Sequence, residues 1–195
     1  MKRELKVYKV GFIVFPGVEE LDFVGAWEVL GTLEHFSKEA CFKNRTVGTI
    51  AGPIKCAHGL TILPDETLSN LSDYDVIVVP GGPGVTQAMK NEQLLSEIRK
   101  VYEDGKLICS VCTGSFILAE AGILEGKKAT TYHTYVEKLS EYGAIPVKER
   151  VVVEGNVITG AGVSATIDVG LKIVEIVFGT NVVKKVAEWI EYIEG

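Results

Sequence analysis

Two cysteines lie where an apolar strand is expected to turn into a helix, in the stretch LICSVCTGSF. Cys109 and Cys112 have the C-x-x-C spacing, and a Thr-Gly pair follows the second of them. Because a thiolate is both a nucleophile and a metal ligand, this spacing allows several kinds of chemistry. The stretch could be a redox pair, half of a zinc site, a single nucleophile, or two buried side chains without chemistry.

The surrounding residues separate these four interpretations. Cys109 lies inside an apolar run, which favours a small buried strand residue over the partner in a redox pair. Zinc needs about four ligands, and the sequence has no second C-x-x-C and no H-x-x-H. Cys41 and Cys56 would join such a site only through an accident of the fold. We therefore expect no metal and no other cofactor, and two inert cysteines stay open as the alternative.

A single nucleophile on a sharp strand-to-helix turn is the fourth interpretation. Such an elbow lifts one side chain above the sheet, and the small residues Gly114 and Ser115 leave room for it. At a helix N-terminus, unpaired N–H groups and the helix dipole stabilise a thiolate. The backbone N–H of Thr113 can point at developing negative charge. The turn therefore predicts Cys112 as a nucleophile that is held as a thiolate.

Strands alternate with helices along the chain, which predicts a parallel sheet covered on both faces. Apolar strands are expected in residues 7–16, 73–79 and 106–111, and helices from about Glu20 and over 91–105. The carboxyl ends of parallel strands meet at one edge, where ligands bind. Phe15-Pro16-Gly17, Pro80-Gly81-Gly82 and the cysteine turn are therefore expected at the same edge.

The rest of the chain is expected to complete one domain over residues 1–195, without a linker or an internal repeat. We expect two strands around a Gly-Pro turn, a short strand, a helix, a hairpin turning at Glu154-Gly155-Asn156, and two final helices. These elements correspond to residues 41–64, 127–133, 134–143, 145–162, 164–179 and 182–195.

Two further groups fit a site at the shared edge. Gly81 and Gly82 allow backbone amides to approach a bound group closely, although a plain turn explains them equally well. Asp22 lies just inside the first helix, where a carboxylate also suits the helix dipole. Glu19 and Glu20 share this neighbourhood and are less specific.

Composition narrows the function classes. The chain has 195 residues, of which 47% are hydrophobic and 24% charged, and its net charge is −6. This charge argues against nucleic acid or an anionic membrane as a partner. No apolar run reaches the ~20 residues of a membrane span, and the N-terminus lacks the core of a signal peptide. We expect a cytoplasmic protein whose four cysteines are reduced.

Four stretches together resemble the PfpI/ThiJ superfamily, from about Val10 to Phe178. They are FPGVEELDFVGAWEVL, VIVVPGGPG, ICSVCTGSFILAEAGILEGKKATTYH and VITGAGVSATIDVGL. The resemblance implies a flavodoxin-like three-layer sandwich with a mostly parallel central sheet and a nucleophile elbow. VCTGSFILAEAGILEGKKATT and PGVEELDF are most similar to the isonitrile hydratase branch. They also resemble the sensor domain of transcription regulators whose helix-turn-helix region we do not find in this sequence.

The resemblance assigns roles to individual residues. Cys112 matches the nucleophile, Asp22 the acid that contacts it, and Thr113 the neighbour after it. Gly82 and Thr113 match the amide pair of the anion site, beside Gly81. Most relatives are dimers, so a homodimer is implied.

Histidine is where this sequence departs from the pattern. Protease-like relatives carry a histidine directly after the nucleophile, where this chain has Thr113, which argues against peptidase activity. Other relatives have T-T-H, whereas here Tyr132 follows the Thr-Thr pair and His133 comes one residue later. A Cys-His dyad would rest on His133, because His35 and His58 are expected at the surface.

A carboxylate beside a thiolate is expected to share one proton with it, because two like charges in one pocket repel. Protonated Asp22 and ionised Cys112 would suit hydration of an isonitrile to an N-substituted formamide through a thioimidate. The alternatives are a glyoxalase- or deglycase-like enzyme acting on α-oxoaldehydes, a redox sensor whose cysteine is oxidised, and a metabolite-binding module without catalysis. Asp168, Trp27 and Trp189 are expected to be structural.

Overall fold

The computed structural model describes residues 6–36 and 40–192, and its centre is a seven-stranded sheet. The strand order is β10-β11-β7-β6-β1-β2-β5, and every neighbouring pair is parallel except β10 and β11. The sheet strands are β1 (Lys6–Val14), β2 (Ala40–Gly48), β5 (Glu66–Thr67), β6 (Val76–Val79), β7 (Leu107–Val111), β10 (Val151–Glu154) and β11 (Val157–Gly160).

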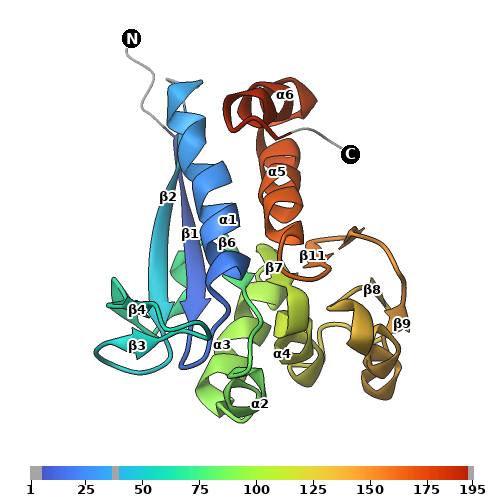
Figure 1. The fold of residues 1–195 in the computed structure, drawn as a ribbon. Helices are drawn as coiled ribbons and strands as arrows, with labels where there is room; N and C mark the ends of the chain where they lie inside the picture. The colour runs from blue at the N-terminus through green and yellow to red at the C-terminus, as the bar shows by residue number, and fades with distance from the viewer. Residues whose placement is uncertain (1–5, 37–39, 193–195) are drawn as a thin grey trace.

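Helices cover both faces of this sheet, as expected from the alternation of elements (Figure 1). On one face α1 and α5 pack against each other, and α6 follows α5; α3 and α4 lie on the other face with α2. The α-helices are α1 (Glu20–Gly31), α2 (Val85–Ala88), α3 (Glu92–Glu103), α4 (Ser115–Glu120), α5 (Ala165–Phe178) and α6 (Thr180–Trp189). The 3-10 helices are η1 (Thr32–His35), η2 (Leu71–Asp73), η3 (Cys112–Gly114) and η4 (His133–Tyr142).

The central strands form the core. Residues 10–14 of β1 and all four residues of β6 are buried, which follows from strands covered on two faces. The fold is therefore the flavodoxin-like α/β sandwich that the resemblance implied. Among the described residues, no helix is both long and apolar enough to cross a membrane.

Three local expectations need correction or refinement. Residues 41–64 do not form two strands around the Gly-Pro turn, because β2 pairs with β1 and β5 in the main sheet. The second half instead folds on itself as a small ribbon of β3 (Ile54–Lys55) and β4 (Thr61–Ile62). Residues 133–142 form the 3-10 helix η4, and β8 (Lys128–Ala129) pairs with β9 (Ile145–Pro146) outside the main sheet.

The hairpin turn at residues 154–156 is confirmed, with Gly155 at φ 64°.

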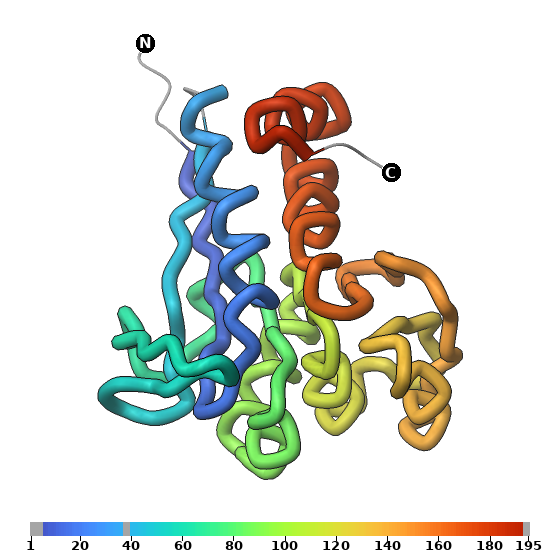
Figure 2. Tube along the Cα trace, viewed as in Figure 1, coloured from blue at the N-terminus to red at the C-terminus, as the bar shows by residue number. Residues whose placement is uncertain are grey.

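The parallel pairing of β1, β6 and β7 brings their carboxyl ends to one edge of the sheet. The three motifs that follow these strands therefore lie together, as predicted. The tube in Figure 2 shows α1 and α5 running side by side, and α1 begins near that same edge.

Candidate active site

Cys112 occupies the sharp turn between β7 and α4. Its φ of 55° is in the left-handed region, which L-residues other than glycine adopt at a cost and which recurs at functional sites. Hydrogen bonds hold the turn in place: its N–H donates to Ala161 O at 2.9 Å, and its carbonyl accepts from Thr131 Oγ1 at 2.8 Å and Ser115 Oγ at 3.2 Å. The side chain of Cys112 is 7% exposed, so it is reachable only through a cavity.

Cys109 is sealed inside β7 with no exposed surface. Burial raises the pKa of its thiol. A thiol in this position cannot act as the accessible partner of a redox pair, and all four cysteines are free. The C-x-x-C spacing therefore reflects one buried strand residue followed by one residue on the turn.

Asp22 lies in the first turn of α1 and is fully buried. Its Oδ2 accepts a hydrogen bond from Gly81 N at 2.8 Å, whereas its buried Oδ1 has no ordinary hydrogen-bond partner among the described residues. The carboxyl group interacts with the Cys112 side chain, and this interaction lowers the pKa of the carboxyl group. The structure thus brings together two residues that are 90 positions apart in the sequence.

Contacts between α1 and α5 fix the position of Asp22. Thr166 Oγ1, at the start of α5, donates to Asp22 O at 2.7 Å and accepts from Ala26 N at 3.0 Å. Gly25 permits this approach, because a Cβ there would lie 2.3 Å from Thr166 Cγ2. One hydroxyl group therefore ties the first turn of α1 to the neighbouring helix.

The glycine pair after β6 lies against the same carboxyl group. A Cβ on Gly81 would lie 2.6 Å from Thr113 Oγ1 and 3.0 Å from Asp22 Oδ2, so only glycine fits between these groups. Gly82 has a φ of 122°, and its N–H donates to Thr113 Oγ1 at 3.0 Å. In this structure the Gly82 N–H is thus bonded to the Thr113 hydroxyl, and the amide pair of Gly82 and Thr113 stays a prediction.

Three hydrogen bonds to the Cys112 sulfur favour its ionised form. They come from the backbone of Thr113, the backbone of Val163 and the side chain of Thr113. Burial and the nearby Asp22 carboxylate act more strongly in the opposite direction and raise the pKa of Cys112 to about 11. The hydrogen bonds at the turn thus offset only part of the effect of burial, and the ionised state of Cys112 stays a prediction.

The pKa of Asp22 rises to about 7, from its usual value of 3.8, mainly through burial and also through the charge of Glu19. At pH values between the pKa of Asp22 and the pKa of Cys112, the two groups together hold one proton and one negative charge. The sequence-based prediction places this proton on Asp22, whereas the higher pKa of Cys112 favours the proton on sulfur. Transfer of that proton from sulfur to carboxylate gives a nucleophile and an acid in contact.

A cavity of about 660 Å³ opens onto Cys112 and Thr113. The cavity is bounded by the segment after β6, by α2, by Phe116 of α4 and by η4. Its lining residues are Glu19, Gly82, Pro83, Val85, Thr86, Met89, Cys112, Thr113, Phe116, Tyr132, Tyr135, Lys138, Glu141, Tyr142 and Val163. None of these lining residues is a histidine.

His133 does not lie in this cavity. Its side chain is exposed and its ring contacts the ring of Tyr132 at a centroid distance of 4.4 Å. Tyr132 takes the place facing the cavity, and the next residue along the chain is turned outward at the start of η4. The structure therefore gives no support to a Cys112-His133 dyad.

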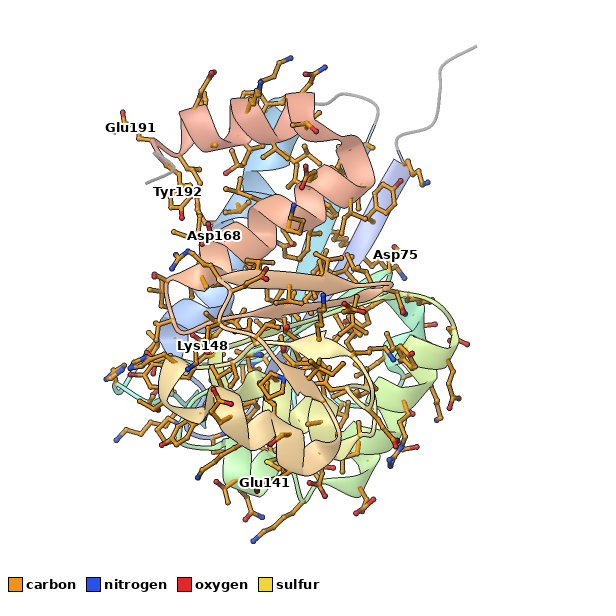
Figure 3. All side chains as sticks on the ribbon, turned by 90° about the vertical axis from the view of Figure 1, so that its right-hand side faces the viewer. Asp75, Glu141, Lys148, Asp168, Glu191 and Tyr192 are labelled. Atoms are coloured by element: carbon orange, nitrogen blue, oxygen red, sulfur yellow. The ribbon has the colours of Figure 1, made fainter. Side chains whose placement is uncertain are left out.

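Asp168 is also separate from the cavity. Its carboxylate accepts hydrogen bonds from Arg150 Nε at 2.6 Å and Tyr192 Oη at 2.8 Å, as expected for a structural residue. Figure 3 shows Asp168 and Tyr192 together near α6, with Glu141 of the cavity at the other end of the molecule. This arrangement links α5 to the segment that follows α6.

Sequence reasoning missed Val163 and gave Glu19 too little weight. Val163 follows β11, which is parallel to β7, so its amide reaches the shared edge of the sheet. The VITGAG stretch at the end of that strand could have indicated this. Glu19 lines the cavity, raises the pKa of Asp22 and pairs with His58 Nε2 at 3.0 Å.

The fold and the cysteine turn define a class: flavodoxin-like α/β proteins with a cysteine on the sharp turn after a central parallel strand. Comparison of the sequence with known families gives the family within that class. The profile of the DJ-1/PfpI family matches residues 8–176, and the chain belongs to this family.

Relatives in the family carry different activities. The chain is 39% identical over 184 residues to isonitrile hydratase of Pseudomonas putida, covering 94% of this chain and 78% of that protein. It is 32% identical over 150 residues to deglycase PH1704 of Pyrococcus horikoshii, and the match covers 76% of this chain and 86% of that protein. A THiJ/PfpI family protein of Pseudomonas syringae superposes with a TM-score of 0.88 at 32% identity, covering 98% of this chain and 77% of that one.

Proposed function

We propose that the chain is a cysteine-dependent enzyme that hydrates an isonitrile to an N-substituted formamide. One arrangement carries this proposal: the buried Asp22 carboxyl group interacts with the Cys112 side chain, at a cavity with no histidine among its described lining residues. Hydration of an isonitrile requires a nucleophile and a proton donor at one carbon atom, which this pair can supply. The similarity to the Pseudomonas putida isonitrile hydratase supports the same conclusion.

The first half of the proposed reaction forms a covalent intermediate. The Cys112 sulfur attacks the terminal carbon of R–N≡C, and the shared proton passes from Asp22 to that carbon. The product is the thioimidate R–N=CH–S–Cys112, and Asp22 is left as a carboxylate. The N–H groups of Thr113 and Val163 stabilise the charge on sulfur before attack.

The second half releases the product. The Asp22 carboxylate takes a proton from water as the water oxygen adds to the thioimidate carbon, and passes this proton to the nitrogen. The carbon–sulfur bond then breaks as the hydroxyl proton returns to Asp22, R–NH–CHO leaves, and the pair again holds one proton. Atoms balance as one isonitrile and one water for one formamide, without a cofactor.

Replacement of Cys112 tests the covalent route. We expect Cys112→Ala and Cys112→Ser each to lower turnover of an alkyl isonitrile by at least a thousandfold, because neither offers a thiolate. Formamide release is followed by chromatography, and circular dichroism checks that the fold is kept. Cys41→Ala serves as the matched control, since Cys41 lies on β2 and does not line the cavity. A serine variant with wild-type turnover would refute the covalent route.

A deglycase- or glyoxalase-like activity is the second candidate, and the similarity to deglycase PH1704 favours it. In this case the Cys112 sulfur would attack the aldehyde carbon of an α-oxoaldehyde. Parallel assays with methylglyoxal and an alkyl isonitrile separate the two. Turnover of methylglyoxal alone would replace the first proposal with the second.

A homodimer, which the family resemblance implies, is the proposed assembly. Leu21 and Val24 of α1 are 40% and 42% exposed, although both are apolar. They lie three positions apart and so on neighbouring parts of one helix face. Pairing of this face with a second copy would bury them.

A further inference from the structure

Four aromatic rings form one side of the cavity that opens onto Cys112. The "aromatic wall" consists of Phe116, Tyr132, Tyr135 and Tyr142. The rings form a connected cluster: Phe116 to Tyr135 at 6.4 Å, Phe116 to Tyr142 at 5.9 Å, and Tyr132 to Tyr135 at 6.1 Å between centroids. These contacts preorganise a surface of fixed shape within the same cavity as the sulfur.

The wall presents apolar surface that nothing in the described chain covers. Tyr135 is 41% exposed, whereas Phe116 behind it is 9% exposed. Met89 and Val163 also line the cavity and add apolar side chains to it. An apolar group bound here would contact ring faces and remove this surface from water.

The charges around the cavity disfavour an anionic substrate. Glu19 and Glu141 line the cavity with one lysine, Lys138, so the charged side chains of its lining carry a net negative charge. The ammonium group of Lys138 lies 5.2 Å from the centroid of the Tyr135 ring. The net negative charge would repel a carboxylate or phosphate on the substrate.

We infer that the substrate is a neutral isonitrile whose nitrogen carries an aromatic or similarly large apolar group, and that the aromatic wall binds this group. The inference rests on the proposed function and adds its substrate class. The isonitrile group is linear, so its substituent extends away from the attacked carbon into the cavity. A methyl group would leave most of a cavity of about 660 Å³ to water.

Three substrates test this inference: benzyl isonitrile, methyl isonitrile and 4-carboxybenzyl isonitrile. For the wild type we expect kcat/KM for benzyl isonitrile to exceed that for methyl isonitrile by roughly a hundredfold, from burial of the ring. The carboxylated substrate should fall at least tenfold below benzyl isonitrile.

Variants of Tyr135 connect this preference to the wall. Tyr135→Ala should lower the benzyl-to-methyl ratio of kcat/KM by roughly tenfold, mostly through KM, because ring contacts of this kind are lost. Tyr135→Phe keeps the ring and should keep the ratio. Trp189→Ala removes a different exposed ring, 56% exposed on α6, and should leave the ratio unchanged.

The outcomes distinguish the two levels of the proposal. Turnover of methyl isonitrile at least as efficient as that of benzyl isonitrile overturns the inference and leaves the hydratase standing. A ratio unchanged in Tyr135→Ala also overturns it. No turnover of any of the three isonitriles overturns the proposed function, and the inference fails with it.

Discussion

Asp22 and Cys112 each have a raised pKa, and neither value follows from its residue type or position in the sequence. A carboxylate at a helix N-terminus is normally stabilised by the helix dipole. Here complete burial, together with the charge of Glu19, outweighs the hydrogen bonds from Gly81 and Cys112 and raises the pKa of Asp22. The outcome is a carboxyl group that can hold a proton near neutral pH, as the proposed mechanism requires.

This coupling predicts a particular pH dependence of the rate. We expect kcat/KM to rise through pH 7, because the reactive pair must first lose one of its two protons, near the Asp22 pKa of about 7. It should fall only near pH 11, where the second proton leaves. Initial rates between pH 5 and pH 10 define the rising limb.

The rising limb should move in Asp22→Asn. The Cys112 thiol must then ionise without a neighbouring base, and burial raises its pKa. We expect the limb to shift by at least one pH unit to higher pH. The rate of Cys112 alkylation by iodoacetamide, read by mass spectrometry, reports this shift even if turnover is lost. An unshifted limb would remove Asp22 from the reactive pair.

The same carboxyl group makes the stability of the protein depend on pH. The folded state binds a proton on Asp22 more tightly than the unfolded state, so stability falls as pH rises from about 4 to about 7. The Asp22→Asn variant should not lose stability in this way, because asparagine does not titrate. We expect the variant to gain roughly 2–3 kcal/mol relative to wild type between pH 5 and pH 8, measured by urea unfolding. If the free energy of unfolding of the variant differed from that of wild type by the same amount at pH 5 and at pH 8, burial would not be the cause of the raised pKa of Asp22.

At the scale of elements, the contact between α1 and α5 holds the acid in place. Gly25→Ala would place a Cβ 2.3 Å from Thr166 Cγ2, where α1 must move away from α5. We expect a loss of about 1–3 kcal/mol in the free energy of unfolding and a lower rate, because Asp22 lies one turn earlier. Chemical denaturation and the isonitrile assay measure the two effects.

Gly31→Ala is the matched control in the same helix. The nearest atom to a Cβ at this position is Asn44 Nδ2 at 4.0 Å. Alanine favours helix over glycine, so this variant should be as stable as wild type or more stable. Equal destabilisation by the two substitutions would argue against the close approach of the helices.

Much of this arrangement could be predicted from sequence, because it depends on periodicity and on the parallel sheet. The ends of β1, β6 and β7 were expected at one edge, and α1 was expected to begin at Glu20, as found. The ribbon of β3 and β4 was not predicted, because its turn is held by a contact far away in sequence. Glu20 Oε1 accepts from His58 N at 2.8 Å and Leu60 N at 3.3 Å.

The electrostatics of the site could not be predicted in the same way. Whether Cys112 is a thiolate depends on how deeply its sulfur is buried and on its distance from Asp22. Both quantities result from packing between residues 90 positions apart. Likewise, the outward position of His133 depends on the start of η4, which no local pattern marks.

At the scale of the whole molecule, the exposed apolar residues of α1 predict assembly. The chain has a mass of 21.2 kDa, and we expect light scattering to report about twice that mass for the proposed homodimer. Val24→Lys should shift the protein to the monomer, because a charge would be buried in the interface. The control is Ile176→Lys on α5: Ile176 is 49% exposed, and this variant should stay a dimer. A monomeric wild type would refute the dimer.

The left-handed backbone at Cys112 has a consequence for how this protein can change over time. Glycine would adopt this conformation freely, whereas a residue with a Cβ loses on the order of 1 kcal/mol there. Selection for stability alone would therefore favour replacement of Cys112 by glycine. A cysteine retained at such a position in a lineage is a record of selection for what its sulfur does.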